Sequence, residues 1–124
     1  FPTVYYLTHP GATAAVSTLE ATGLMVELQD RLAVDEALAA AYQAAHEAYI
    51  GDRDAVASAC GLEPVDEIAG ISAGGMPVRV KCLHALVGHA LAAGPGVNPM
   101  GDIALELCSW SPDRCQCEPS WGTE

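Results

Sequence analysis

The longest periodic segment of the chain is the alanine-rich run Glu36–Cys60, with the sequence EALAAAYQAAHEAYIGDRDAVASAC. Apolar residues recur along it every three or four positions, which is typical of one face of an α-helix. These residues are Leu38, Tyr42, Ala45, Tyr49, Val56 and Ala59. Asp35 is a favourable N-cap for this helix, while Gly51 and Asp52 predict a break or bend near residues 50–53.

Shorter helical patterns precede and follow this run. They cover residues 12–21, 24–33, 77–93 and 100–110. Residues 1–7, FPTVYYL, are β-branched and aromatic and are typical of a strand, and a second short strand is expected at residues 68–71. The predicted fold class is therefore α+β: a mostly helical single domain with one or two short strands.

The length of the chain allows one domain, so residues 1–124 are treated as a single unit. Residues 109–124 form an irregular C-terminal tail in this interpretation. The chain opens at once on strand-like residues, without a leader, and we expect that an N-terminal segment of the full-length protein precedes it. With no signal peptide visible, the expected location is the cytoplasm, where the five cysteines would be free, metal-bound or catalytic.

The charge balance disfavours several classes of partner. Five Lys and Arg residues face sixteen Asp and Glu residues, which gives a formal net charge of −11. Nucleic acids and anionic membrane surfaces both require clustered basic residues, so neither is an expected partner. The apolar runs are also too short to span a bilayer.

The stretch VKCLHALVGHAL, residues 80–91, concentrates a cysteine and two histidines. On a regular helix Cys82 and His89 share a face but lie roughly 10.5 Å apart along the axis. Cys82 and His84 point to nearly opposite sides of such a helix. A straight helix therefore does not chelate a metal with this stretch alone, because zinc ligands lie about 2.0–2.3 Å from the ion.

Two arrangements would make the stretch functional. Either residues 81–84 belong to a non-helical lead-in, or each side chain meets partners from elsewhere in the chain. His9 is one such partner, since it follows the first predicted strand, and the Cys115-x-Cys117 pair is a reserve.

Three hypotheses remain open for this stretch. The leading one is a metal site, with zinc as the cofactor and with ligands drawn from His9, Cys82, His84 and His89. The second is a non-enzymatic interaction module, in which Cys82 and His89 are core residues and the 35–60 helix docks a partner protein or a second copy of the chain. The third is a metal-free thiol hydrolase or transferase, in which Cys82 is the nucleophile and a histidine is the base.

A glycine-rich loop immediately precedes the stretch, in the sequence GISAGGMPVRVK. Its Gly74 and Gly75 are followed by Arg79 and Lys81, which are two of only five basic residues in the chain. Exposed backbone N–H groups and local positive charge together favour anions. We therefore expect these four residues to bind a small anionic ligand, although the spacing matches neither a Walker A loop nor a dinucleotide fingerprint.

Three blocks of the sequence carry a family resemblance: FPTVYYLTHP, VKCLHALVGHALA and GVNPMGD. Together they resemble domain-of-unknown-function family 501, a bacterial family prominent in actinobacteria. The resemblance implies no established activity. It does imply that the LTHP block often reads LTCP in relatives, and an exchange of Cys for His9 suits a soft metal ligand better than a catalytic thiol.

Overall fold

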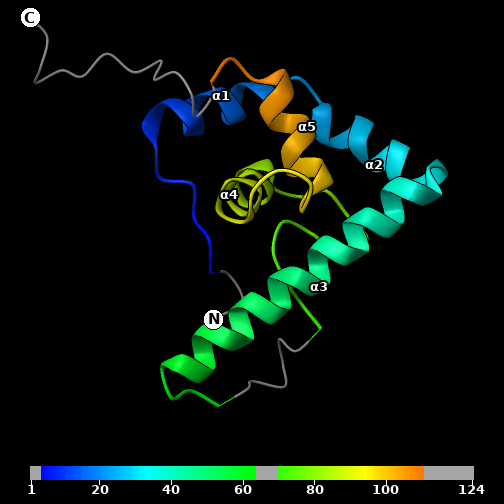
Figure 1. The fold of residues 1–124 in the computed structure, drawn as a ribbon. Coiled ribbons are helices and arrows are strands. Elements are labelled where there is room, and N and C mark those ends of the chain that lie inside the picture. Colours follow the sequence, from blue (N-terminus) through cyan, green and yellow to red (C-terminus); the bar gives the residue numbers. More distant parts are fainter. Residues whose placement is uncertain (1–3, 64–69, 111–124) are drawn as a thin grey trace, which may run out of the picture.

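The computed structural model describes residues 4–63 and 70–110, and within these ranges the fold is all-helical (Figure 1). The elements are α1 (Pro10–Ala21), α2 (Leu24–Val34), α3 (Glu36–Ala59), α4 (Leu83–Ala93) and α5 (Pro99–Leu107). The predicted irregular tail lies outside the described residues from position 111 onward.

The α+β prediction is wrong, because no strand occurs among the described residues. Residues 4–9 have the expected strand composition but pair with no other backbone segment in the part of the chain that the structure describes. Instead, the N–H groups of Val4 and Tyr5 donate to the Tyr49 hydroxyl, at 2.8 and 3.3 Å. A side chain of α3 thus takes the place of a neighbouring strand. Of the second predicted strand, positions 68 and 69 lie outside the described residues, and 70–71 form no strand.

Two further predictions about helices need correction. The α3 helix runs without interruption through residues 50–53, where Asp52 accepts a hydrogen bond from the Tyr5 hydroxyl at 2.9 Å. The α4 helix begins at Leu83 and not at Pro77. Gln29 of α2 keeps the intervening backbone non-helical. Its side-chain amide donates to the Val78 carbonyl at 2.9 Å and accepts from the Val80 N–H at 2.8 Å.

Helix α4 lies at the centre of the fold, with α1, α3 and α5 arranged around it (Figure 1). Its sequence is apolar on nearly every side, which is the pattern of a helix buried all round. Leu83, Leu86 and Val87 are fully buried and belong to the same core cluster as Tyr42 and Tyr49 of α3. The position of α4 therefore fixes where the histidines and the cysteine of the 80–91 stretch lie.

The close approach of α4 and α5 depends on Gly101. A Cβ atom at this position would clash with the Leu86 carbonyl oxygen and would lie 2.7 Å from the Cβ of Ala90. No side chain larger than hydrogen fits there unless the two helices separate. The GVNPMGD block is thus explained by packing, because it supplies the contact glycine of α5 together with the Asn98 N-cap, whose Oδ1 accepts from the Gly101 N–H at 3.0 Å.

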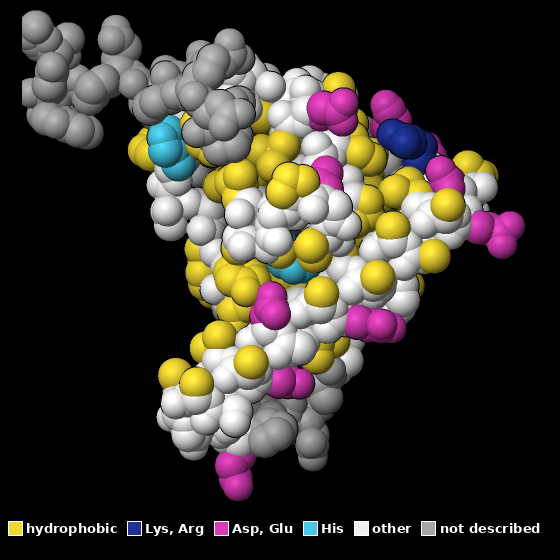
Figure 2. Space-filling view, in the orientation of Figure 1, with side chains coloured by type: hydrophobic (Ala, Val, Ile, Leu, Met, Phe, Trp, Pro, Cys, Tyr) yellow, Lys and Arg dark blue, Asp and Glu magenta, His cyan; other side chains and the backbone are white. Residues whose placement is uncertain are grey.

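The surface carries the acidic character of the sequence. On the face shown in Figure 2, Asp and Glu side chains are scattered over the helices, and Lys or Arg gathers only beside α2. Much of the outer face of α3 is exposed, so the predicted docking of a partner through the 35–60 helix stays a prediction. None of the described helices is long and apolar enough to cross a membrane.

Candidate metal centre

Cys82 and His84 lie on the same side of the chain because Cys82 is not helical. It occupies the N-cap position of α4, where its φ of −149° and ψ of 106° are extended, and His84 lies in the first turn. The opposed orientation expected on a regular helix therefore does not apply. The non-helical lead-in proposed for residues 81–84 is found only at Lys81 and Cys82, because Leu83 and His84 are already helical.

The third member of the group is Glu20, which sequence analysis missed. It lies in the last turn of α1, where a carboxylate is unfavourable for its own helix because that end of the helix dipole is negative. The carboxylate instead faces the positive end of α4 and accepts a hydrogen bond from the Leu83 N–H at 2.9 Å. Since the Cys82 side chain makes no capping bond, Glu20 caps α4 from another helix.

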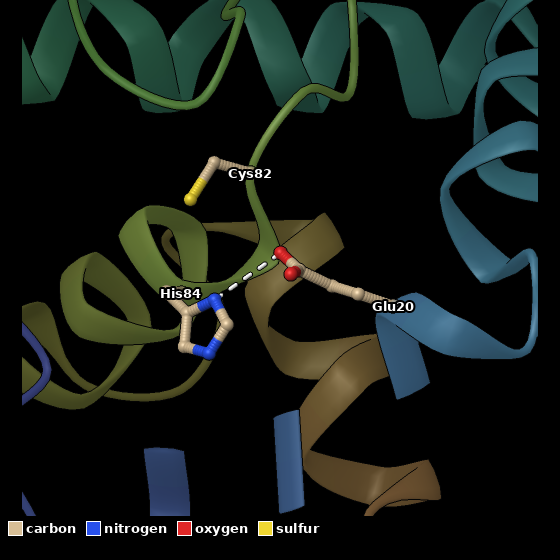
Figure 3. A group of neighbouring side chains, drawn as sticks. All are labelled: Glu20, Cys82 and His84. Atoms are coloured by element: carbon tan, nitrogen blue, oxygen red, sulfur yellow. Dashed lines mark hydrogen bonds and ion pairs between the residues drawn. The ribbon is translucent and has the colours of Figure 1, made fainter. Parts of the chain in front are cut away.

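The carboxylate of Glu20 also faces the imidazole of His84. Its Oε2 lies 3.2 Å from His84 Nδ1 (Figure 3). On the other side of the ring, Nε2 lies 3.2 Å from the Thr13 carbonyl oxygen and 3.1 Å from the Ser17 hydroxyl. Both contacts of Nε2 come from α1, so one helix holds the imidazole from two sides.

These contacts allow two neutral forms of His84. With the proton on Nε2, the ring donates to the Thr13 carbonyl, and the lone pair of Nδ1 faces the Glu20 carboxylate, where a metal ion would be held between the two. With the proton on Nδ1, the ring donates to Glu20 and Nε2 accepts from the Ser17 hydroxyl, and no metal ion is required.

Glu20, Cys82 and His84 form a group that could hold a metal ion (Figure 3). One ligand atom from each lies within 4.8 Å of the other two, and no other such group of three occurs among residues 4–63 and 70–110. Glu20 and His84 are 24% and 26% exposed, and Cys82 is also half-buried, so an ion could enter from solvent. Carboxylate, imidazole and thiolate together are ligands that zinc accepts.

His9 is not part of this group. It is the N-cap of α1, and its Nδ1 accepts hydrogen bonds from the N–H groups of Gly11 and Ala12 at 3.0 and 3.3 Å. Its ring also packs against Trp110, with the ring centroids 5.2 Å apart.

His89 is likewise separate from the group and is fully buried. Its Nδ1 accepts from the Asn98 side-chain amide at 3.1 Å, because the Oδ1 of that amide is already engaged by Gly101. The ring lies parallel to Tyr5 and edge-on to Tyr49, at centroid distances of 5.8 and 5.0 Å. Burial lowers the pKa of His89, although the charge of Asp52 acts in the opposite direction.

The predicted anion loop has a structural explanation of its own. Gly74 and Gly75 have positive φ angles of 66° and 93°, and a Cβ at either would crowd the neighbouring 79–86 segment. Their carbonyls accept from the N–H groups of Lys81 and Arg79, at 2.7 and 2.9 Å, which closes the turn that leads to Cys82. Both basic side chains are exposed. Anion binding by these four residues stays a prediction.

The cysteines outside the group differ in their surroundings. Cys60 is exposed, and Cys108 is half-buried with its thiol against the carbonyl oxygens of Leu105 and Trp110, at 3.5 and 3.1 Å. Cys115 and Cys117, the predicted reserve ligands, lie outside the described residues.

Comparison with known protein families gives a match over most of the chain. The sequence profile of the family described as "Protein of unknown function (DUF501)" matches residues 1–106 of the 124. No curated protein and no solved structure matches the chain. The matched span contains Glu20, Cys82 and His84, and it ends before the two cysteines of the tail.

Proposed function

The chain belongs to the DUF501 family, and we propose that it is a transition-metal-binding protein whose ligands are Glu20, Cys82 and His84. The observation that carries the proposal is the convergence of these three side chains from α1 and the start of α4 to within 4.8 Å. The contact between Nε2 of His84 and the Thr13 carbonyl supports it, because metal-bound histidines usually donate their other ring N–H in this way.

We propose zinc as the resident metal. A thiolate, an imidazole and a carboxylate together favour a borderline-soft ion, whereas magnesium and calcium prefer all-oxygen sites. Three protein ligands leave one position of a tetrahedral ion for water or a substrate atom, which is the arrangement of catalytic zinc sites. A zinc ion bound there would supply Lewis acidity and an activated water.

The ligand set in this proposal differs from the one predicted from sequence. Cys82 and His84 are retained, and Glu20 takes the place of His9 and His89, whose Nδ1 atoms are engaged by backbone N–H groups and by Asn98. A reducing cytoplasm remains part of the proposal, since the free Cys60, Cys82 and Cys108 are compatible with it.

A metal-free explanation of the same contacts is a structural cap. A protonated His84 would form an ion pair with Glu20, and the carboxylate would still accept from the Leu83 N–H. This arrangement joins α1 to α4 but gives Cys82 no role. The two explanations therefore differ in whether the thiol of Cys82 contributes to binding.

Cobalt substitution separates the two explanations. The reduced full chain is freed of metal with a chelator, titrated with Co²⁺, and followed by absorption spectroscopy. We expect one equivalent to bind, with a thiolate-to-cobalt charge-transfer band that is absent from the Cys82→Ser variant. Competition with Zn²⁺ should abolish the band.

Two sets of variants serve as controls. Cys108→Ser and Cys60→Ser each remove a thiol outside the group, and both should keep the band. Cys115→Ser/Cys117→Ser tests the reserve ligands of the tail. A band that survives Cys82→Ser but disappears in the tail variant would overturn the proposed ligand set.

A further inference from the structure

Cys82 is the one sulfur ligand of the Glu20, Cys82 and His84 group. Hydroperoxides convert thiolates to sulfenic acids, whereas carboxylate and imidazole ligands have no corresponding two-electron step under mild conditions. The three ligands therefore differ sharply in their sensitivity to oxidants. This difference in sensitivity to oxidants is the basis for a regulatory role of Cys82. The inference rests on the proposed function.

Cys82 is partly exposed, and its thiol is uncommitted. It is half-buried, it is not in a disulfide, and it makes no hydrogen bond to another described residue. Cys108 offers a comparison, since its thiol is equally free of disulfide but is directed at two carbonyl oxygens. Cys60 is more exposed but belongs to no group of potential metal ligands in the described part of the chain. Of the three cysteines that the structure describes, Cys82 is therefore the one whose oxidation would alter the proposed metal site.

We propose that Cys82 is a redox switch, and that its oxidation by a hydroperoxide releases the metal held with Glu20 and His84. In the step, the Cys82 sulfur attacks one peroxide oxygen, an S–O bond forms and the O–O bond breaks. Sulfur is oxidised by two electrons, and the peroxide is reduced to hydroxide or an alkoxide, which is protonated by the buffer. The product is Cys82 sulfenic acid.

The switch follows from the small number of ligands. A sulfenic acid is a far weaker zinc ligand than a thiolate, so oxidation leaves an ion with one imidazole and one carboxylate. A site with four protein ligands could retain the metal through the other three. We expect zinc affinity to fall by about 100-fold or more, which is at least the cost of losing a supporting contact to a metal ligand. An external thiol reduces the sulfenic acid and restores the site.

The experiment treats the zinc-loaded full chain with hydrogen peroxide in the presence of a chromogenic zinc indicator. Parallel samples are treated with a sulfenic-acid trap and analysed by peptide mass spectrometry. The expected result is release of the bound zinc in step with trapping at Cys82, and rebinding after addition of a thiol to samples without the trap. Cys60→Ser and Cys108→Ser should release zinc as the wild type does.

The Cys82→Asp variant is the decisive control, because it keeps a zinc ligand that peroxide does not oxidise. We expect it to retain zinc through the treatment. Should this variant bind no zinc, the correlation between release and Cys82 trapping in the wild type still decides the outcome. Zinc that stays bound while Cys82 is oxidised, or that leaves while Cys82 is intact, would overturn the switch but not the metal site. A wild type that never binds zinc would overturn both.

Discussion

Helix α4 carries two histidines whose surroundings have almost nothing in common. His84, in the first turn, is half-buried and meets a carboxylate, a hydroxyl and a carbonyl oxygen, all supplied by α1. His89, near the middle of the helix, is fully buried among aromatic rings and accepts a hydrogen bond from Asn98. The chemistry open to each histidine therefore depends on the groups that the other helices place around its ring.

The two environments favour different roles, a metal ligand for His84 and a structural residue for His89. The environment of His84 is acidic and open to solvent, which favours a cation. The environment of His89 favours the neutral ring, since burial lowers its pKa and Asn98 donates to its lone pair. We therefore expect substitutions at His84 to change metal binding, and substitutions at His89 to change stability.

The largest expected effect is on the free energy of unfolding of His89→Ala. The substitution leaves a cavity in the core and an unpartnered amide on Asn98, which together cost about 2–4 kcal/mol. Urea denaturation followed by circular dichroism measures this loss. A His89→Ala variant within about 0.5 kcal/mol of wild type would contradict the structural role of this residue.

The second effect concerns zinc affinity in the His84→Ala variant. Loss of one of three ligands should weaken zinc binding by at least about 10–100-fold, equivalent to about 1.4–2.7 kcal/mol. Isothermal titration calorimetry with Zn²⁺ measures it, with Ser17→Ala as a milder variant because only a hydrogen bond to Nε2 is removed. Equal zinc binding by His84→Ala and wild type would show that His84 is not a ligand, and the proposed difference in role between His84 and His89 would be wrong.

The third effect is on the pH dependence of stability. Burial lowers the pKa of His89, and it also lowers that of His46, whose Nδ1 lies 2.8 Å from the Ser72 hydroxyl. Because the folded pKa lies below the unfolded value of about 6.5, the stabilisation is complete above that pH. It is lost as the pH falls through the folded pKa, with a slope of at most about 1.4 kcal/mol per pH unit for each group.

Denaturant titrations of metal-free protein between about pH 7 and pH 5 test this dependence. His89→Gln should fold less stably but with a shallower loss of stability on acidification. His46→Gln is the matched variant for the second buried ring. An unchanged slope in both variants would show that neither imidazole is buried in its neutral form.

The smallest effect is on the stability of metal-free Glu20→Gln. The substitution removes the negative charge that caps α4 while preserving the shape of the side chain. A carboxylate at a helix N-terminus contributes about 0.3–1 kcal/mol, so the loss should fall in that range. Thermal unfolding of the metal-free variant measures it. A variant more stable than wild type would show that the negative charge of Glu20 destabilises the metal-free protein.

The sequence predicted the helices well where local signals were strong. Asp35 caps α3 as expected, with its carboxylate accepting from the Leu38 N–H at 3.0 Å, and α1 ends at Ala21 as expected. The family resemblance is confirmed by the match over residues 1–106. The expected strands failed because composition alone does not supply a pairing partner, and residues 4–9 lie against α3 and α4 instead.

The candidate site was only half predictable. Cys82 and His84 were singled out by their residue types, but the non-helical start that brings them together depends on Gln29, which is distant in sequence. Glu20 left one weak signal, since an acidic residue at the end of its own helix is electrostatically unfavourable. Such a conflict often marks a residue with a long-range partner, but it does not identify the partner.

The most direct test of the metal site is the zinc content and zinc affinity of the reduced full chain, measured by elemental mass spectrometry and by competition with a chelator. Wild type and Cys108→Ser should each bind one zinc per chain with equal affinity, and Cys82→Ser should lose at least about 10–100-fold in affinity. Equal binding by all three proteins, or no binding by any of them, would contradict a metal centre formed by Glu20, Cys82 and His84.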